Sequence, residues 1–151
     1  MEEERGLTVK QYRFLHDAWP HQFQIPSEKG YPEIFDLMSH WVMFHNNIPI
    51  GYTGSLDMGH FHFVGNTFIL PQYRQMGWHS YLLSFRNHHL GLRPKITVLN
   101  PIDGTHMINL IKVVSKLGYE PVLDYEDVID IMSEKLYLEI RNENQQIWRK
   151  D

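Results

Sequence analysis

The chain has no cysteine among its 151 residues. This absence excludes a disulfide framework, a thiol nucleophile and any zinc site with cysteine ligands. Basic residues are also few, with 14 Lys and Arg against 18 Asp and Glu, and the formal net charge is -4. Nonspecific nucleic-acid binding needs a basic face that displaces counterions, so we expect no nucleic-acid partner. A small anion needs only a local basic pocket.

Long apolar runs are missing as well. No segment approaches the 18 consecutive apolar residues of a membrane-spanning helix. The opening stretch, MEEERGLTVK, is acidic and lacks the apolar centre of a secretory signal. We therefore predict a cytoplasmic protein without a membrane partner. The length and the 42% of hydrophobic residues suit a single domain that covers residues 1–151.

The apolar patterns predict a mixed sheet flanked by helices. A strand that turns into a helix is expected over 8–19, and from residue 40 the order β-β-β-α-β-α-β is followed by one more strand. The first two strands form a hairpin, and the later part contains a β-α-β unit with a right-handed crossover. The fold class is α/β (α+β), with a mostly antiparallel sheet. The predicted strands are 40–46, 50–57, 60–70, 95–100, 119–125 and 134–142, the helices are 77–91 and 105–118, and 143–151 is a polar, frayed tail.

The stretch LPQYRQMGWHS, residues 70–80, stands between an apolar strand and an amphipathic helix. A helix N-terminus has unpaired backbone N–H groups and a partial positive charge, and both suit a phosphate. Gly77 allows a bulky anion to approach the backbone, and Arg74 adds charge. The stretch has a plainer interpretation too, because a turn with a surface arginine before a helix is common.

This corner resembles the acyl-coenzyme A site of the GNAT superfamily of N-acyltransferases. The family motif is Gln/Arg-x-x-Gly-x-Gly/Ala, and here Arg74-Gln75-Met76-Gly77-Trp78-His79 follows a Pro-Gln-Tyr turn. Downstream, Lys116-Leu117-Gly118-Tyr119 between a helix and a strand is similar to another family segment, so the resemblance covers about residues 40–123. It implies an N-acetyltransferase that moves an acetyl group from acetyl-CoA to a primary amine, by direct attack in a ternary complex.

The resemblance also implies which residues hold the cofactor. Backbone groups of the strand before the corner would bind the pantetheine arm, backbone N–H groups of the corner would bind the pyrophosphate, and Arg74 would shape the turn. Two asparagines further on would bind the pantetheine amides. The implied cofactor-binding residues are Phe68, Ile69, Leu70, Arg74, Gln75, Gly77, Trp78, His79, Asn100 and Asn109.

The catalytic base is predicted among histidines. The family often uses a carboxylate on the long strand, but none occurs between Gly59 and Leu70. His60 and His62 would share one face of this strand, and an imidazole with a pKa near ~6.5 is a suitable base. We predict His62 first, His60 next and Asp57 as a further candidate; the alternative is that the histidines only pack. Two ligands do not make a metal site, so we predict no metal.

Two departures from the family pattern support a second hypothesis. His79 stands where the family prefers Gly or Ala, and Val114 stands where it often has the Tyr that protonates the leaving thiolate. The alternative is a non-catalytic member of the same fold that binds an acyl-CoA or a partner. A third option is a histidine–metal hydrolase. The sequence leaves open the amine acceptor, which is a small molecule or a peptide, the acyl length and whether the chain forms a homodimer.

Overall fold

The computed structural model describes residues 6–13, 20, 23, 37–74, 77–99, 104–141 and 145–151. The chain forms two compact units, one made of residues 1–56 and 64–89 and the other of 57–63 and 90–151. The predicted organisation as a single domain stays a prediction. The predicted helix at the end of the 8–19 segment lies outside the described residues.

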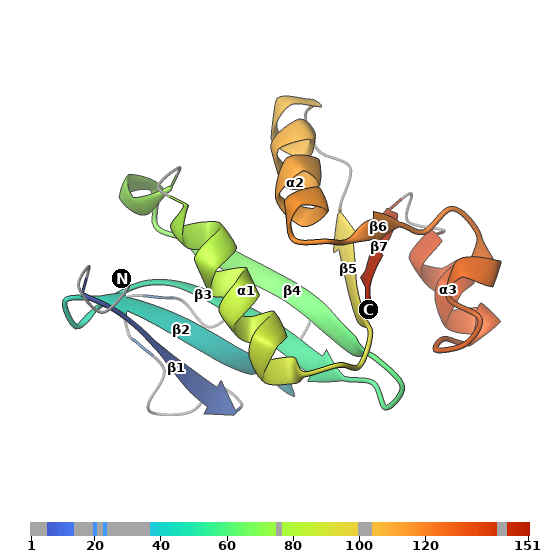
Figure 1. The fold of residues 1–151 in the computed structure, drawn as a ribbon, viewed down its shortest axis with the longest axis horizontal. Helices are drawn as coiled ribbons and strands as arrows, with labels where there is room; N and C mark the ends of the chain where they lie inside the picture. Colours follow the sequence, from blue (N-terminus) through green and yellow to red (C-terminus); the bar gives the residue numbers. More distant parts are fainter. Residues whose placement is uncertain are drawn as a thin grey trace. The chain divides into compact units, whose positions relative to one another are not determined.

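The first unit is built on four strands that are neighbours in sequence order (Figure 1). Their bounds are β1 Leu7–Arg13, β2 Ser39–His45, β3 Ile48–Asp57 and β4 His62–Ile69, of which Asp57 and residues 62–63 belong to the second unit. β2 is antiparallel to both β1 and β3, which confirms the predicted hairpin. Asn46 and Asn47 have φ values of 50° and 67°, and a two-residue hairpin turn of type I′ requires such values.

The first helix, α1 (Trp78–Leu90), lies across β3 and β4 (Figure 1). Arg86 on its buried side donates from Nη1 to the Thr53 hydroxyl at 2.8 Å. The Thr53 hydroxyl also contacts that of Thr67 on β4 at 2.7 Å. These hydrogen-bonded side chains hold α1 against β3 and β4. Gly91, with a φ of 76°, follows the last helical residue as predicted.

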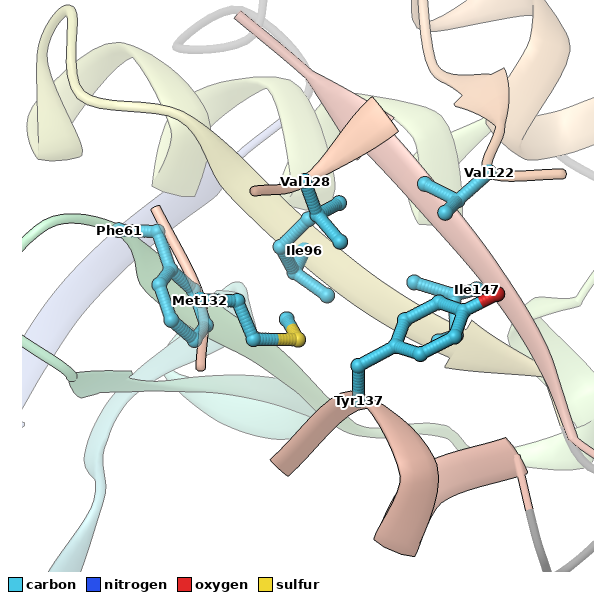
Figure 2. Packing of buried hydrophobic residues seen from close by; sticks show 7 residues of the cluster. All are labelled: Phe61, Ile96, Val122, Val128, Met132, Tyr137 and Ile147. Carbon is cyan, nitrogen blue, oxygen red and sulfur yellow. The ribbon is translucent and has the colours of Figure 1, made fainter. Parts of the chain in front are cut away.

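The second unit has strands in the order β5-β7-β6 and two helices. Their bounds are β5 Lys95–Leu99, α2 Gly104–Lys116, β6 Glu120–Pro121, α3 Glu134–Arg141 and β7 Gln146–Lys150. Figure 2 shows the core of this unit, in which apolar side chains from β5, β7 and α3 point toward one another. The members of this core are Phe61, Ile96, Val122, Val128, Met132, Tyr137 and Ile147.

Two sequence predictions near the C-terminus were wrong. Within the predicted strand 134–142, the described residues 134–141 form α3 rather than a strand. The backbone N–H of Leu136 donates to the Ser133 hydroxyl at 3.2 Å, which caps the helix start. The residues that contact the core lie at helical spacing, namely Leu136, Tyr137 and Ile140. Burial of this face favoured the 3.6-residue period of a helix over the apparent strand-like alternation of apolar and polar residues.

The tail is also not frayed. Within 143–151, β7 lies between β5 and β6 and is antiparallel to both. Ile147 and Trp148 are buried, and two apolar residues were too short a signal to predict a strand. The predicted strand 119–125 is reduced to the two residues of β6.

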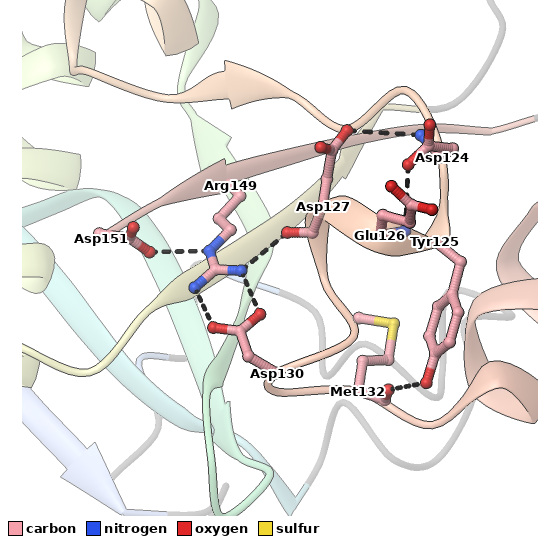
Figure 3. Close-up of polar contacts among 8 residues, drawn as sticks. All are labelled: Asp124, Tyr125, Glu126, Asp127, Asp130, Met132, Arg149 and Asp151. Atoms are coloured by element: carbon pink, nitrogen blue, oxygen red, sulfur yellow. Dashed lines mark hydrogen bonds and ion pairs between the residues drawn. The ribbon is translucent and has the colours of Figure 1, made fainter.

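Figure 3 shows a polar network that fixes the segment 124–132 to β7. Arg149 makes a bidentate ion pair with Asp130, at 2.7 and 2.8 Å, and donates to the backbone carbonyl of Asp127 at 2.8 Å. The Arg149 guanidinium lowers the pKa of Asp130 through this pair. Asp124 and Asp127 form a reciprocal capping box. The acidic residues of this segment therefore stabilise the loop in which they lie.

The predicted fold class is confirmed, because the described residues give a mixed, mostly antiparallel sheet with three α-helices in the order β-β-β-β-α-β-α-β-α-β. No helix within the described ranges is long and apolar enough to cross a membrane. The cytoplasmic location stays a prediction.

Candidate acyl-coenzyme A site

The corner between β4 and α1 is shaped by Arg74. After the 3-10 turn η3 (Pro71–Tyr73), the Arg74 side chain turns back, and its Nε donates to the Ile69 carbonyl at 2.8 Å. Its guanidinium carbon lies 5.6 Å from the centre of the Phe68 ring, in a cation–π contact. The terminal Nη groups have no partner within the described parts of the chain. Arg74 thus fixes the corner and keeps N–H donors for an anion.

Gly77 is the cap of α1. Its carbonyl accepts from the backbone N–H of Tyr81 at 3.2 Å, and its φ is 78°. Among the described residues other than its chain neighbours, none has a heavy atom within 4 Å of the position that a Cβ would take. The first turn of α1 carries no acidic side chain, whereas His88 and His89 occupy its last turn. The positive end of the helix dipole is therefore uncompensated beside open space, which suits a phosphate.

Three aromatic rings gather beside this corner. Tyr73 and Trp78 stand on either side of residues 74–77, and their rings stack at 5.4 Å between centres. The ring of His45, at the end of β2, lies 5.0 Å from that of Trp78 and 5.8 Å from that of Tyr73. The stacked rings of Tyr73 and Trp78 thus join the residues that precede and follow 74–77. No role was predicted for the rings of His45 and Tyr73, because only the tertiary structure brings the end of β2 to this place.

The end of β4 lies close against β3. The backbone N–H of Leu70 donates to the Ile50 carbonyl at 2.9 Å. A Cβ at Gly51 would lie 2.8 Å from the Phe68 carbonyl oxygen, so only glycine permits this approach. The Leu70 N–H and the Ile69 carbonyl, both predicted to serve a cofactor arm, thus have partners within the protein.

His79 lies in the first turn of α1 and is half-buried. Burial lowers its pKa, and the positive charges of Arg86 and Arg74 lower it further. The imidazole is therefore neutral at physiological pH and adds no positive charge to the corner. The attraction for an anion at the corner therefore comes from the backbone N–H groups and from Arg74.

In the second unit, His62 is buried and joined to Arg93. The Arg93 Nη2 donates to His62 Nε2 at 2.7 Å, so this nitrogen carries the lone pair and the proton stays on Nδ1. Within the described residues, His62 Nδ1 has no hydrogen-bond partner. Arg93 also forms a bidentate pair with Asp57, at 2.9 and 3.0 Å, which lowers the pKa of that carboxyl.

Of the remaining predicted site residues, His60 and Asn109 are described, and both are exposed. His60 is exposed in the bend before β4, so the predicted strand 60–70 begins two residues later, at His62. The His60 ring has no hydrogen-bond partner among the residues that the structure describes. Asn109 is an exposed residue of α2. Gln75 and Asn100 lie outside the described residues. None of these cofactor or catalytic roles is tested by the geometry, so they stay predictions.

Burial lowers the pKa of His62 below its ordinary value, and the charge of Arg93 acts in the same direction. Below about pH 6.5 the unfolded chain binds a proton at this residue that the folded chain does not, so stability should fall as the pH falls. We expect His62→Gln to flatten this dependence, by at most about 1.4 kcal/mol per pH unit. Urea unfolding between pH 5.0 and 7.5 measures it, with the exposed His88→Gln as the control; identical slopes for the two variants would contradict the prediction.

Comparisons with solved structures agree with the fold described above. Neither a family model nor a curated relative matches the sequence. Among solved structures, N-acetylglutamate synthase from Neisseria gonorrhoeae, complexed with coenzyme A and N-acetyl-glutamate, is similar with a TM-score of 0.60 and 14% identity; the match covers 95% of this chain but only 35% of the synthase. A GNAT family acetyltransferase from Elizabethkingia anophelis with acetyl-CoA bound has a TM-score of 0.60, 11% identity and coverage of 97% and 98% of the two chains.

IAA acetyltransferase from Bacillus cereus gives the same TM-score of 0.60, with 14% identity over 94% of this chain and 97% of that one. The likeness is thus one of whole-chain architecture rather than of sequence. With the strand order, the corner and the glycine-capped helix already established, it leads to one conclusion: this chain has the fold of the GNAT acetyltransferases.

Proposed function

We propose that the protein is an acetyl-CoA-dependent N-acyltransferase. The observation that carries the proposal is the corner at Arg74–Gly77, where the glycine-capped N-terminus of α1 has no acidic side chain in its first turn and no described heavy atom near the Cβ position of Gly77, in a fold shared with acetyltransferases. The coenzyme A pyrophosphate would bind the backbone N–H groups of Gly77, Trp78 and His79, together with the predicted Gln75. The terminal groups of Arg74 would add charge-assisted hydrogen bonds.

The reaction would be a direct attack of a primary amine on the thioester in a ternary complex. Its nitrogen must lose a proton, and the developing oxyanion must meet a donor such as a backbone N–H. Without cysteine, a thiol acyl-enzyme is excluded. The sequence predicted His62 as the base and His60 next. The Nε2 lone pair of His62 is engaged by Arg93, whereas the ring of His60 is exposed, so the contacts rank His60 first.

A non-catalytic, acyl-CoA-binding protein is the second candidate function. It is favoured by Val114, a buried aliphatic residue at the position where the family often has its acid. A neutral His79 in the first turn of α1 points the same way, because it occupies a position that the family keeps small.

Calorimetric titration with acetyl-CoA and with coenzyme A, followed by a thiol-release assay with added amines, tests the proposal. We expect binding of both ligands in the micromolar range and amine-dependent release of coenzyme A. His60→Gln should slow this release more than His62→Gln does. Binding without release for any amine would favour the non-catalytic candidate, and absence of binding would contradict both.

A further inference from the structure

In the first unit, the side chains of His40 and Asn66 form a hydrogen bond across Gly54, which has no side chain to separate them. His40 on β2 is paired with Gly54 on β3. The contact between the hydroxyls of Thr53 and Thr67 places the next β3 residue, Gly54, opposite Asn66 on β4. A Cβ at Gly54 would lie 3.0 Å from His40 Nε2. Since the glycine has no side chain, His40 and Asn66 reach one another across two strand spacings, about 9.5 Å.

The hydrogen bond between them has a fixed direction. Asn66 Nδ2 lies 2.9 Å from His40 Nε2, and because an amide nitrogen only donates, His40 Nε2 is the acceptor. His40 is fully buried, and the ring of Tyr52 packs against it at 5.8 Å in an edge contact. The histidine therefore fixes the orientation of the amide from inside the sheet.

The other end of the amide is open. Asn66 is only half-buried, and no described residue is hydrogen-bonded to its Oδ1. Its φ is 52°, a left-handed conformation in the middle of a strand, which asparagine tolerates better than most residues. This conformation interrupts the alternation of β4 and changes the direction of the side chain. Asn66 precedes Phe68, the first residue of the predicted cofactor arm, by two positions.

We propose that Asn66 binds the amine acceptor, with its Oδ1 accepting an N–H of the incoming amine, and that His40 is the positioning residue that aims this oxygen. The proposal rests on the proposed function and specifies how that site takes its second substrate. An amide oxygen accepts from an ammonium and from a neutral amine alike, so it holds the nitrogen before and after the base removes the proton. Asn66 itself transfers no proton.

Three variants separate binding from structure. Asn66→Gly removes the amide and keeps a residue that adopts positive φ without strain. His40→Leu removes the partner of the amide, and His40→Gln keeps an acceptor for it. The probes are four amines, namely spermidine, tyramine, L-glutamate and a lysine peptide amide. Each is titrated by NMR into ¹⁵N-labelled protein saturated with coenzyme A, and the Asn66 side-chain signal is identified by its loss in Asn66→Gly.

We expect at least one amine to shift the Asn66 side-chain signal. Asn66→Gly should weaken binding of that amine by about tenfold or more, since a hydrogen bond to a charged group is lost. His40→Leu should weaken it less, and His40→Gln should stay near wild type. Where turnover is measured, the KM for the amine should rise in Asn66→Gly while the acetyl-CoA Kd stays within about twofold.

The proposal is overturned if no amine shifts the signal, if Asn66→Gly binds the amine as wild type does, or if acetyl-CoA affinity falls in parallel. Such failure is distinct from failure of the proposed function, because acetyl-CoA binding to the wild type, and its loss on changing the Arg74–Gly77 corner, are measured separately.

Discussion

Replacing Gly77 by glutamate should abolish coenzyme A binding. Within the described parts of the chain nothing fills the space beside Gly77, so the new side chain would enter the region expected for the pyrophosphate. Its carboxylate would repel the phosphates, and juxtaposed like charges cost several kcal/mol. We expect Kd to rise by a factor of about 100 or more, which is about 2.7 kcal/mol. Calorimetric titration of wild type and variant with coenzyme A measures the change.

Gly91→Glu is the matched control for this experiment. Gly91 follows the other end of α1, has a φ of 76° against 78° at Gly77, and likewise has no heavy atom of a described residue beyond its chain neighbours within 4 Å of a Cβ. Both variants therefore introduce the same charge and the same backbone strain, of order 1–3 kcal/mol. Coenzyme A binding that survives in Gly77→Glu, or that is lost equally in Gly91→Glu, would exclude the corner as the phosphate site.

Ile147→Ala should destabilise the protein by about 2–5 kcal/mol, since truncating a fully buried aliphatic side chain loses its burial and leaves a cavity. Ile147 is 1% exposed, and its side chain points into the core that Figure 2 shows. Its carbonyl also accepts from the backbone N–H of Val122 at 2.8 Å, which fixes β7 in place. A loss of this size is a large share of the 5–15 kcal/mol that is usual for the free energy of unfolding of a native protein. Urea unfolding at constant pH measures it.

Leu123→Ala serves as the control for Ile147→Ala. Leu123 belongs to the same unit but is 79% exposed, and exposed substitutions usually change stability by no more than about 0.5 kcal/mol. Equal, small effects for both variants would mean that residues 146–150 behave as the frayed tail that their polar composition predicted.

Local signals in the sequence determined the first half of the fold. Asn46-Asn47 predicted the hairpin turn, because asparagine tolerates the positive φ that the turn requires. Gly91 predicted the end of α1 for the same kind of reason. The corner at 70–80 was recognisable because its parts are contiguous, so strand, turn and helix follow within one stretch of chain.

Features that depend on distant residues were decided by tertiary structure. The segments that became α3 and β7 have short and ambiguous apolar patterns, and burial of Tyr137 and Ile147 in one core selected a helix for the first and a strand for the second. The engagement of His62 by Arg93 joins residues 31 positions apart, so no spacing rule predicts it.

The sequence by itself thus determined the class of fold and predicted a place for a phosphate, since both follow from backbone preferences within a few residues. Only the tertiary structure decided which polar side chains meet. His40 and Asn66 are 26 positions apart and come together because Gly54, on a third strand, leaves room between them. Side-chain chemistry at such a place depends on the register of three strands, and a linear pattern contains no record of that register.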